Sequence, residues 1–395
     1  MDFDLSWLLL GLPVAFVLGW LASRLDLRQL RLENRQAPKA YFRGLNFLLN
    51  EQQDQAIDAF IEAVQNDPDT QELHFALGNL FRRRGEYQRA VRVHEHLLSR
   101  GDLNRADRDR AQHALAQDFL SAGLLDRAEV ALQKLEGTRF ENESRLALLA
   151  IYERSREWAQ AEAVAAKLDA SDQASYAARR AHHLCEQAAE QSARGNADEA
   201  LRLLQEAAQL APQAPRPPID TAALLLRQGR AAEAWGTLSA LARTAPLALP
   251  LYAAALQQAA QGAGEQAAAT ALLHERYEAE PSIDVLEALM ALEASMQPAA
   301  PADGRPAPTA SRDRYLEHLT RVPGSLLAAS RWLAGETLRD DARTHPPVQR
   351  ALDQVARPQM RYRCAACGFE AHQYFWHCPG CQAWDSYPPR RVEEL

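Results

Sequence analysis

The last four cysteines of the chain have the spacing of a four-thiolate metal site. Cys364, Cys367, Cys378 and Cys381 form a Cys-x2-Cys-x10-Cys-x2-Cys array, and the chain has one other cysteine. Two such pairs close a tetrahedral site, usually around zinc and sometimes around iron. The ten-residue connector is long enough for a hairpin that brings the two pairs together. We therefore expect these residues to bind one zinc ion, with iron and a pair of disulfides as the alternatives.

The residues around the cysteines indicate a structural role for the metal. Gly368 follows the second cysteine, where such turns often need a positive φ, whereas Gln382 takes that place in the second turn and suits it less well. His372 and His377 are potential ligands, but four cysteines already complete the shell. A closed shell leaves no position for a substrate. Residues 361–395 are also too few to bury a core, so metal binding would supply much of their folding energy.

Composition and charge exclude some classes of function. The chain has 395 residues, enough for two or three domains, and is 47% hydrophobic but only 7% aromatic, which suits a helical protein rich in Ala and Leu. Its net charge of −8 argues against a general nucleic-acid binder. The cysteine segment, residues 361–395, has four basic and four acidic residues. It lacks the basic surface of a nucleic-acid-binding zinc ribbon, so we expect no nucleic-acid partner.

The N-terminus has the pattern of an uncleaved membrane anchor. Leu5 to Ala22 contains no charged residue, and 18 residues make about 27 Å of helix, which nearly spans a bilayer core. Acidic residues precede this stretch, unlike in a signal peptide, and basic residues follow it. We expect an anchor at 1–23 and a basic juxtamembrane segment at 24–36. The positive-inside rule then places the N-terminus in the periplasm and the rest of the chain in the cytoplasm. The cytoplasm is reducing, so cysteines there remain thiols that can bind a metal.

Small residues recur at every fourth position of this anchor. Such a stripe allows another membrane helix to approach closely. The alternative is that membrane helices use Gly and Ala freely, with no partner implied. The hypothetical membrane-helix interface consists of Gly11, Ala15, Gly19 and Ser23.

The middle of the chain repeats itself with a period of 34 residues. Small residues such as Gly78 and Ala90 lie where two antiparallel helices would touch, and large ones such as Phe81 lie where the helices would interlock. This register is that of tetratricopeptide repeats, and an ordinary helical bundle would not reproduce it. We expect about seven repeats over residues 37–296, stacked into a superhelix. The predicted fold class is all-α: this superhelix, one N-terminal transmembrane helix and a small C-terminal rubredoxin-like four-cysteine metal ribbon.

Many groove-facing positions of the repeats hold basic residues. In the tetratricopeptide family these positions line the concave face of the superhelix. A basic groove would capture an acidic segment of a partner protein. The alternative is a solvated polar face in a chain with 41 arginines and only three lysines. Cys185 also falls at a groove position and is interpreted as a small residue. The groove hypothesis rests on Arg82, Arg83, Arg110, His113, Arg154, Arg216 and Arg227.

The composition changes after the repeats. Residues 297–311 are rich in Pro and Ala and are predicted to form a linker or a disordered loop. Residues 312–357 have helical apolar patterns and are predicted to form a closing segment. The metal-binding domain is expected at 358–395. The common catalytic motifs, including the phosphate-binding loop, His-Glu-x-x-His and Gly-x-Ser-x-Gly, do not occur in the sequence, which favours binding over catalysis.

The order of these parts resembles the lipopolysaccharide assembly protein B family of Gram-negative bacteria. The resemblance covers essentially the whole chain, and its most specific elements are Cys364-x2-Cys367-Gly368 and Cys378-Pro379-x-Cys381 after the repeats. It implies a non-enzymatic regulator of lipopolysaccharide synthesis in the bacterial inner membrane. In that family the metal module packs against the repeats, and both are needed for function.

The resemblance also implies partners. Members of the family act as adaptors that promote degradation of the committed-step deacetylase of lipid A synthesis by the membrane-bound protease FtsH. Other inner-membrane proteins of lipopolysaccharide synthesis or transport are further expected partners. Two other functions fit the same sequence: a membrane-tethered scaffold for another envelope assembly complex, and a redox carrier that holds iron. An iron site would give a coloured protein, whereas a zinc site is colourless.

Overall fold

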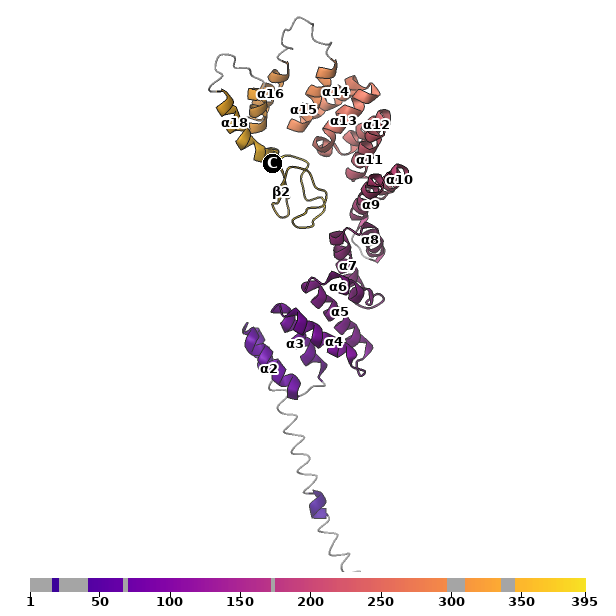
Figure 1. Ribbon diagram of the computed structural model, residues 1–395, viewed down its shortest axis with the longest axis vertical. Coiled ribbons are helices and arrows are strands. Elements are labelled where there is room, and N and C mark those ends of the chain that lie inside the picture. Colours follow the sequence, from indigo (N-terminus) through magenta and orange to yellow (C-terminus); the bar gives the residue numbers. More distant parts are fainter. Residues whose placement is uncertain (1–15, 21–41, 67–69, 172–174, 297–309, 335–344) are drawn as a thin grey trace, which may run out of the picture. The chain divides into compact units, whose positions relative to one another are not determined.

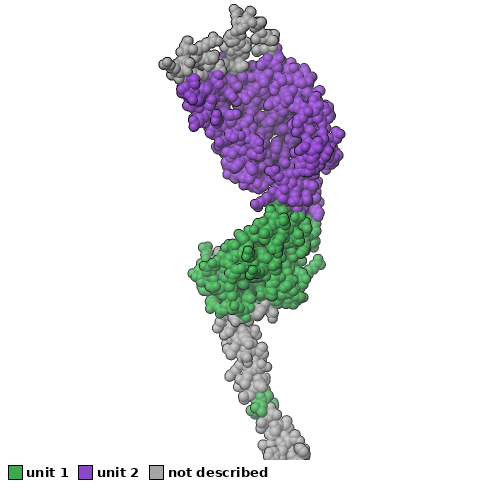
Figure 2. Space-filling view, viewed as in Figure 1, with its two compact units in different colours: residues 1–151 green, residues 152–395 purple. Residues whose placement is uncertain are grey.

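A computed structural model of the chain describes residues 16–20, 42–66, 70–171, 175–296, 310–334 and 345–395 (Figure 1). Residue contacts group the chain into two compact units, Met1–Ile151 and Tyr152–Leu395 (Figure 2). The division falls inside the expected repeat region and within helix α7, Glu141–Ser155.

The first unit consists of helices joined by short turns. After the short helical stretch at residues 16–20, residues 42–49 form the next described helix. The next helices are α2 (Gln53–Asn66), α3 (Gln71–Arg83), α4 (Tyr87–Ser99), α5 (Arg105–Ser121), α6 (Leu125–Gln133) and the first residues of α7.

The second unit continues the same pattern and ends in a small ribbon. After the last residues of α7 come α8 (Trp158–Ser171), α9 (Ala177–Ala193), α10 (Ala197–Leu210), α11 (Arg216–Arg227), α12 (Ala231–Thr244), α13 (Leu249–Ala263), α14 (Gln266–Ala279) and α15 (Ile283–Met296). Then follow α16 (Ala310–Arg321), α17 (Leu326–Ala334), α18 (His345–Ala356), β1 (Tyr362–Arg363) and β2 (Glu370–Ala371), with 3-10 turns at Pro246–Ala248, Arg357–Met360 and Val392–Glu394.

The helices between residues 42 and 279 form seven consecutive pairs in the described part of the chain, each closed by the same turn. In each pair, the residue two positions before the start of the second helix has a positive φ. The backbone amide of the residue that follows it donates a hydrogen bond to a carbonyl near the end of the first helix, which closes the turn. Glycine occupies this position in five turns because it adopts positive φ without steric cost. The other two turns have Glu51 and Arg156, with φ of 58° and 60°.

Small residues allow the paired helices to pack closely. A methyl group added to Gly78 of α3 would lie 2.5 Å from Nε2 of His94 in α4, so only glycine fits at this crossing. Ala90, Ala116 and Ala128 are completely buried at other crossings. This close packing of Ala and Leu explains how a chain with few aromatic residues builds a core.

The largest buried cluster lies in the second unit and includes the closing helices. Leu238, Leu256 and Leu289, from α12, α13 and α15, are completely buried in it. Leu327 of α17 and Ala356 of α18 belong to the same cluster. Helices α16 to α18, in the segment predicted to close the array, therefore extend the core of the last repeats.

Most of the expected anchor lies outside the described residues. Residues 16–20 are helical, with large exposed apolar side chains such as Phe16 and Trp20, and open space surrounds Gly19. Within the described ranges, no helix has both the length and the apolar character needed to cross a membrane. Gly11, Ala15, Ser23, the basic segment 24–36 and most of the linker 297–311 also lie outside these ranges.

Candidate metal centre

Two similar turns hold the four cysteines. In the first, the amide of Gly368 donates to the carbonyl of Cys364 at 2.9 Å; in the second, the amide of Gln382 donates to the carbonyl of Cys378 at 2.9 Å. The short β1–β2 hairpin supports the first turn. Gly368 has a φ of 77° and Gln382 a φ of 62°. Both turns therefore need a left-handed residue, as expected, and the second one places a long side chain there.

The four sulfur atoms fit a tetrahedral metal ion. All lie within 4.8 Å of one another. The pairs Cys364–Cys381 and Cys367–Cys378 have sulfur separations of 3.8 Å. A tetrahedron with metal–sulfur bonds of about 2.3 Å has edges of about 3.8 Å. A disulfide would need a sulfur separation of about 2 Å, so this arrangement does not fit the disulfide alternative.

Neighbouring groups favour ionisation of one of the four thiols, that of Cys364. The pKa of Cys364 falls to about 6: burial opposes ionisation, but hydrogen bonds from Ser386 and from backbone amides outweigh it. The sulfur of Cys364 lies 3.3 Å from the hydroxyl of Ser386, and that of Cys378 lies 3.8 Å from the hydroxyl of Tyr387. Cys364 and Cys378 are buried, whereas Cys367 and Cys381 are exposed. The site thus faces solvent on one side while its four sulfurs complete the shell.

The donor set determines what a bound metal would do. Four thiolates would satisfy a tetrahedral ion and leave it no open position for substrate. The metal would link the two halves of the ribbon, around a core formed by Tyr362, Cys364, Cys378 and Tyr387. The geometry therefore suits a structural ion, and the rubredoxin-like four-cysteine site predicted from the spacing is present.

Trp384 anchors the ribbon to the repeats. Its indole N–H donates to Oε1 of Glu153, near the end of α7, at 3.1 Å. Its ring stacks on His182 of α9 at a centroid distance of 4.7 Å, and on His377 of the ribbon at 4.3 Å. Asp385 lies beside it, with Oδ2 2.8 Å from Nε2 of His182. Two consecutive ribbon residues therefore contact both α7 and α9.

Glu153 is a buried carboxylate with several donors. Arg179 donates to both of its oxygens at 2.6 Å, and Nε2 of His183 donates at 2.7 Å. Burial alone would raise the pKa of Glu153, but the hydrogen bonds from Arg179 and His183 lower it to about 2. Glu153 is thus an anion at neutral pH, and the indole of Trp384 adds a further donor to it.

The C-terminal residues hold the ribbon to the closing helices. Glu394 accepts a hydrogen bond from the amide of Ile283, at the start of α15, at 2.7 Å, and Glu393 accepts one from the amide of Leu327, in the first turn of α17, at 2.8 Å. Carboxylates at these positions satisfy unpaired amides and complement the helix dipoles. Arg391 forms two hydrogen bonds with Asp284 at 2.8 and 2.9 Å.

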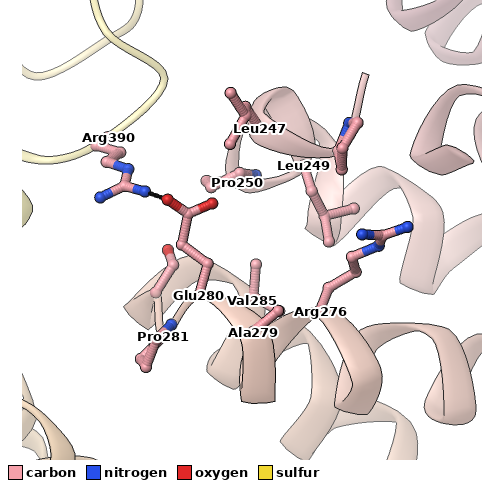
Figure 3. Close-up of a pocket in the computed structure, with 11 residues that line it drawn as sticks. Leu247, Leu249, Pro250, Arg276, Ala279, Glu280, Pro281, Val285 and Arg390 are labelled. Atoms are coloured by element: carbon pink, nitrogen blue, oxygen red, sulfur yellow. Dashed lines mark ion pairs between the residues drawn. The ribbon is translucent and has the colours of Figure 1, made fainter. Parts of the chain in front are cut away.

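A small cavity lies beside this attachment. Figure 3 shows Arg390 of the C-terminal segment paired with Glu280, at the corner between α14 and α15. Apolar residues such as Leu249 and Val285 line the cavity, whose volume is about 110 Å³. Ligand pockets usually have at least about 300 Å³. We therefore interpret this cavity as a packing gap beside the ion pair.

The expected groove residues have different environments. In the first unit, Arg82 contacts Asp118 at 2.8 Å. Arg110 similarly contacts Glu72 at 2.6 Å. His113 stacks on Phe140, and its Nε2 lies 3.2 Å from Glu143. Arg83 is exposed.

The remaining groove candidates lie in the second unit. Arg216 is buried and pairs with Glu186 at 2.7 Å, and Arg227 contacts Ser192 at 3.2 Å. Arg154 is exposed. Most of the seven candidates thus satisfy carboxylates or hydroxyls of the chain itself. Cys185 of α9 is buried among apolar residues of α9 and α10, and this burial raises the pKa of its thiol.

Sequence reasoning missed the residues that seat the ribbon. Glu153, His182 and His183 carry no motif, and Trp384 is separated from Glu153 by 231 positions. His377, which the sequence offers as a potential ligand, stacks on Trp384 at the contact with the repeats. His372 is exposed. A tryptophan after the last cysteine pair was the one available signal, because exposed tryptophans often belong to contacts.

Two protein families match parts of the chain. Residues 362–388 match the family described as "Rubredoxin metal binding domain", and residues 73–109 match the family described as "Tetratricopeptide repeat". These matches confirm the predicted helical repeats and the rubredoxin-like ribbon. A solved tetratricopeptide repeat protein from Parabacteroides merdae has a TM-score of 0.33 and 17% identity, and the match covers 66% of this chain and 99% of that one.

Similarity to curated proteins extends over the full chain. Lipopolysaccharide assembly protein B of Escherichia coli strain K12 is 31% identical over 392 residues, which cover 98% of each chain. The Haemophilus influenzae protein of the same name is 26% identical over 408 residues and also covers 98% of each chain. The similarity therefore includes the N-terminal region, the repeats and the ribbon together.

Proposed function

The chain belongs to the lipopolysaccharide assembly protein B family, and from this premise we propose that it is a non-enzymatic adaptor of lipopolysaccharide synthesis in the bacterial inner membrane. It promotes degradation of the lipid A pathway deacetylase by the protease FtsH. The repeats bind the deacetylase, and the membrane segment brings the complex to the protease. Other inner-membrane proteins of lipopolysaccharide synthesis or transport are further candidate partners.

One observation carries this proposal: the metal ribbon packs on repeat helices of the second unit. Trp384 and Asp385 of the ribbon contact α7 and α9, and Glu393 and Glu394 contact the first turns of α17 and α15. A metal site with four thiolates supplies no catalytic position. A rigid repeat surface held by a structural ion suits binding better than catalysis.

The mechanism we propose is presentation of a substrate to a protease. Residues 1–23 anchor the protein and 24–36 form its basic cytoplasmic flank, so the repeats at 37–296 stay close to the membrane. Confinement near a membrane protease raises the effective concentration of whatever the repeats hold. Gly11, Ala15, Gly19 and Ser23 form the face that contacts another membrane helix.

The C-terminal part stabilises the repeat surface in this proposal. The linker at 297–311 leads to the closing segment at 312–357 and the metal domain at 358–395. One zinc ion, held by Cys364, Cys367, Cys378 and Cys381, keeps the ribbon folded. The ribbon in turn fixes the ends of α7, α15 and α17 through its hydrogen bonds.

The half-life of the deacetylase tests the proposal. Cells depleted of this protein should degrade the deacetylase more slowly, with its synthesis rate unchanged. Pulse labelling followed by immunoprecipitation measures both quantities. An unchanged half-life after depletion would reject the adaptor function.

A further inference from the structure

A second cavity lies where the ribbon meets the turn between α7 and α8. Its volume is about 460 Å³, within the usual range for ligand sites. Trp158, Phe375, Trp376 and Pro379 give it apolar walls. All the residues that line it belong to the second unit. The cavity thus combines surfaces of the repeats and of the metal module.

Two arginines also line this cavity: Arg154, in the last turn of α7, and Arg156, in the turn between α7 and α8. Both are exposed. Neither guanidinium forms an ion pair or a hydrogen bond with any residue that the structure describes. Most other candidate groove arginines already contact groups of the chain. The cavity therefore has two positive charges available to a ligand.

The backbone at Arg156 makes its position unusual. Its φ is 60°, and five equivalent turns have glycine at this position. A positive φ strains a residue with a side chain, and such strain is often found at functional sites. Glu51 is the other non-glycine residue at this position, in the first unit. The long side chain of Arg156 is thus placed on the cavity at a cost to the turn.

The acidic residues of the lining are already neutralised. Glu153 is paired with Arg179, and Glu186 is paired with Arg216 at 2.7 Å. These paired carboxylates leave the two exposed arginines as the uncompensated charges. A ligand with one carboxylate and an apolar group beside it matches both the arginines and the aromatic walls.

We propose that this cavity binds a short acidic segment of a partner polypeptide, with the carboxylate on Arg154 and Arg156 and a neighbouring apolar side chain between Trp158 and Trp376. This inference deepens the proposed adaptor function by assigning its substrate contact to one site. It also gives the ribbon a direct part in recognition, because Trp376 belongs to the ribbon.

Peptide selection tests this assignment. The probe is a phage library of random twelve-residue peptides, selected on the full-length, metal-loaded chain in detergent micelles. Enriched peptides are synthesised with a fluorophore, and their dissociation constants are measured by anisotropy. We expect enrichment of Asp or Glu beside a large apolar residue. Replacing that acid by its amide should weaken binding about tenfold, the size expected for a charge-assisted hydrogen bond.

Variants of the two arginines separate recognition from folding. Arg154→Ala and Arg156→Gly should each weaken the enriched peptides about tenfold. Arg156→Gly should also raise the unfolding temperature by about 2 °C, because glycine relieves the positive φ. A purely structural role for Arg156 cannot give these two opposite effects. Arg243→Ala is the matched control, since Arg243 is exposed on α12 and does not line the cavity.

Several results would overturn the assignment. These are no enriched peptide, enriched peptides without acids, binding that survives both arginine variants, and full displacement by millimolar inorganic phosphate. A chain that carries both Arg154→Ala and Arg156→Gly, expressed in depleted cells, distinguishes failure of the cavity assignment from failure of the proposed function. If depletion lengthens the half-life of the deacetylase but the double variant restores it fully, the cavity assignment fails and the adaptor function stands. If depletion has no effect while the peptides depend on both arginines, the adaptor function fails and the site stands.

Discussion

The indole N–H of Trp384 donates to Oε1 of Glu153 at 3.1 Å, and this bond joins the metal ribbon to a repeat helix 231 positions earlier in the chain. Glu153 is 4% exposed and also accepts from Arg179 and His183. Hydrogen bonds to buried charged groups are stronger than those between neutral groups. The contact therefore links the folding of the ribbon to that of the repeats.

Removing this one donor should loosen the ribbon. Trp384→Phe keeps an aromatic ring but removes the N–H, and should cost about 2 kcal/mol, the typical value for a hydrogen bond to a charged group. Chemical denaturation followed by far-ultraviolet circular dichroism gives the change in the free energy of unfolding. Trp376→Phe is the matched control, because its indole N–H has no acceptor among the described residues. Equal losses for the two variants would contradict the role of this bond.

The features that could be predicted depend on residues that lie close together in the sequence. The cysteine pairs predicted a metal site because two turns and a hairpin are local structures. The 34-residue period predicted the paired helices, and glycines such as Gly85 and Gly123 suit the positive φ that the structure shows in the turns between them. The register of small residues such as Gly78 predicted the close helix crossings.

Contacts between distant residues were not predictable in this way. Arg82 and Arg216 fall at groove positions, but only the structure shows that Asp118 and Glu186 pair with them. Family membership predicted that the ribbon packs on the repeats, yet no local pattern indicated that Trp384 makes the contact. A side chain's partner depends on the packing of helices far apart in sequence, and periodicity does not encode that packing.

The second cysteine turn should gain stability from glycine. Gln382 has a φ of 62°, and a left-handed residue costs about 1–2 kcal/mol. Gln382→Gly removes this steric cost, but glycine loses more conformational entropy on folding. The net gain in the free energy of unfolding should therefore be about 1 kcal/mol. We therefore expect a chelator to remove the metal about fivefold more slowly from the variant.

A reverse substitution in the first turn provides the control. Gly368 has a φ of 77°, and open space surrounds its Cα, so Gly368→Gln changes the backbone preference without a clash. It should accelerate metal release by a similar factor. Unchanged release in both variants would show that the turn conformation does not limit stability of the site.

Buried His318 should make the closing helices sensitive to pH. Its Nδ1 accepts from the hydroxyl of Tyr277 at 2.7 Å, and burial followed by the charge of Arg321 lowers its pKa below the usual 6.5. The unfolded chain then takes up a proton near pH 6.5 while the folded chain does not. This stabilisation is complete above pH 6.5 and is lost as pH falls below that value.

Replacement of the histidine tests this dependence. His318→Asn should reduce the fall in unfolding temperature between pH 7 and 5.5, since asparagine does not titrate. His274→Asn, at an exposed position of α14, should leave the fall as in the wild type. A slope equal to that of the wild type in His318→Asn would assign the pH dependence to other groups.

The purified chain should contain one zinc ion. Zinc thiolates do not absorb visible light, whereas a four-cysteine iron site is coloured and undergoes reversible reduction. Elemental analysis and a visible spectrum of protein purified without added metal distinguish the two. One equivalent of zinc and a colourless sample would support a structural ion, and a coloured iron protein would support the redox carrier instead.

The most direct test of the account is the half-life of the deacetylase in cells whose only copy of this protein has Cys378→Ser. Cys378 is completely buried, and its sulfur lies 3.8 Å from that of Cys367. Its loss should release the metal, unfold the ribbon and lengthen the half-life to that of depleted cells. Cys185→Ala, which changes a cysteine outside the site, should keep the normal half-life. A Cys378→Ser protein that lacks metal yet maintains the normal half-life would contradict the account.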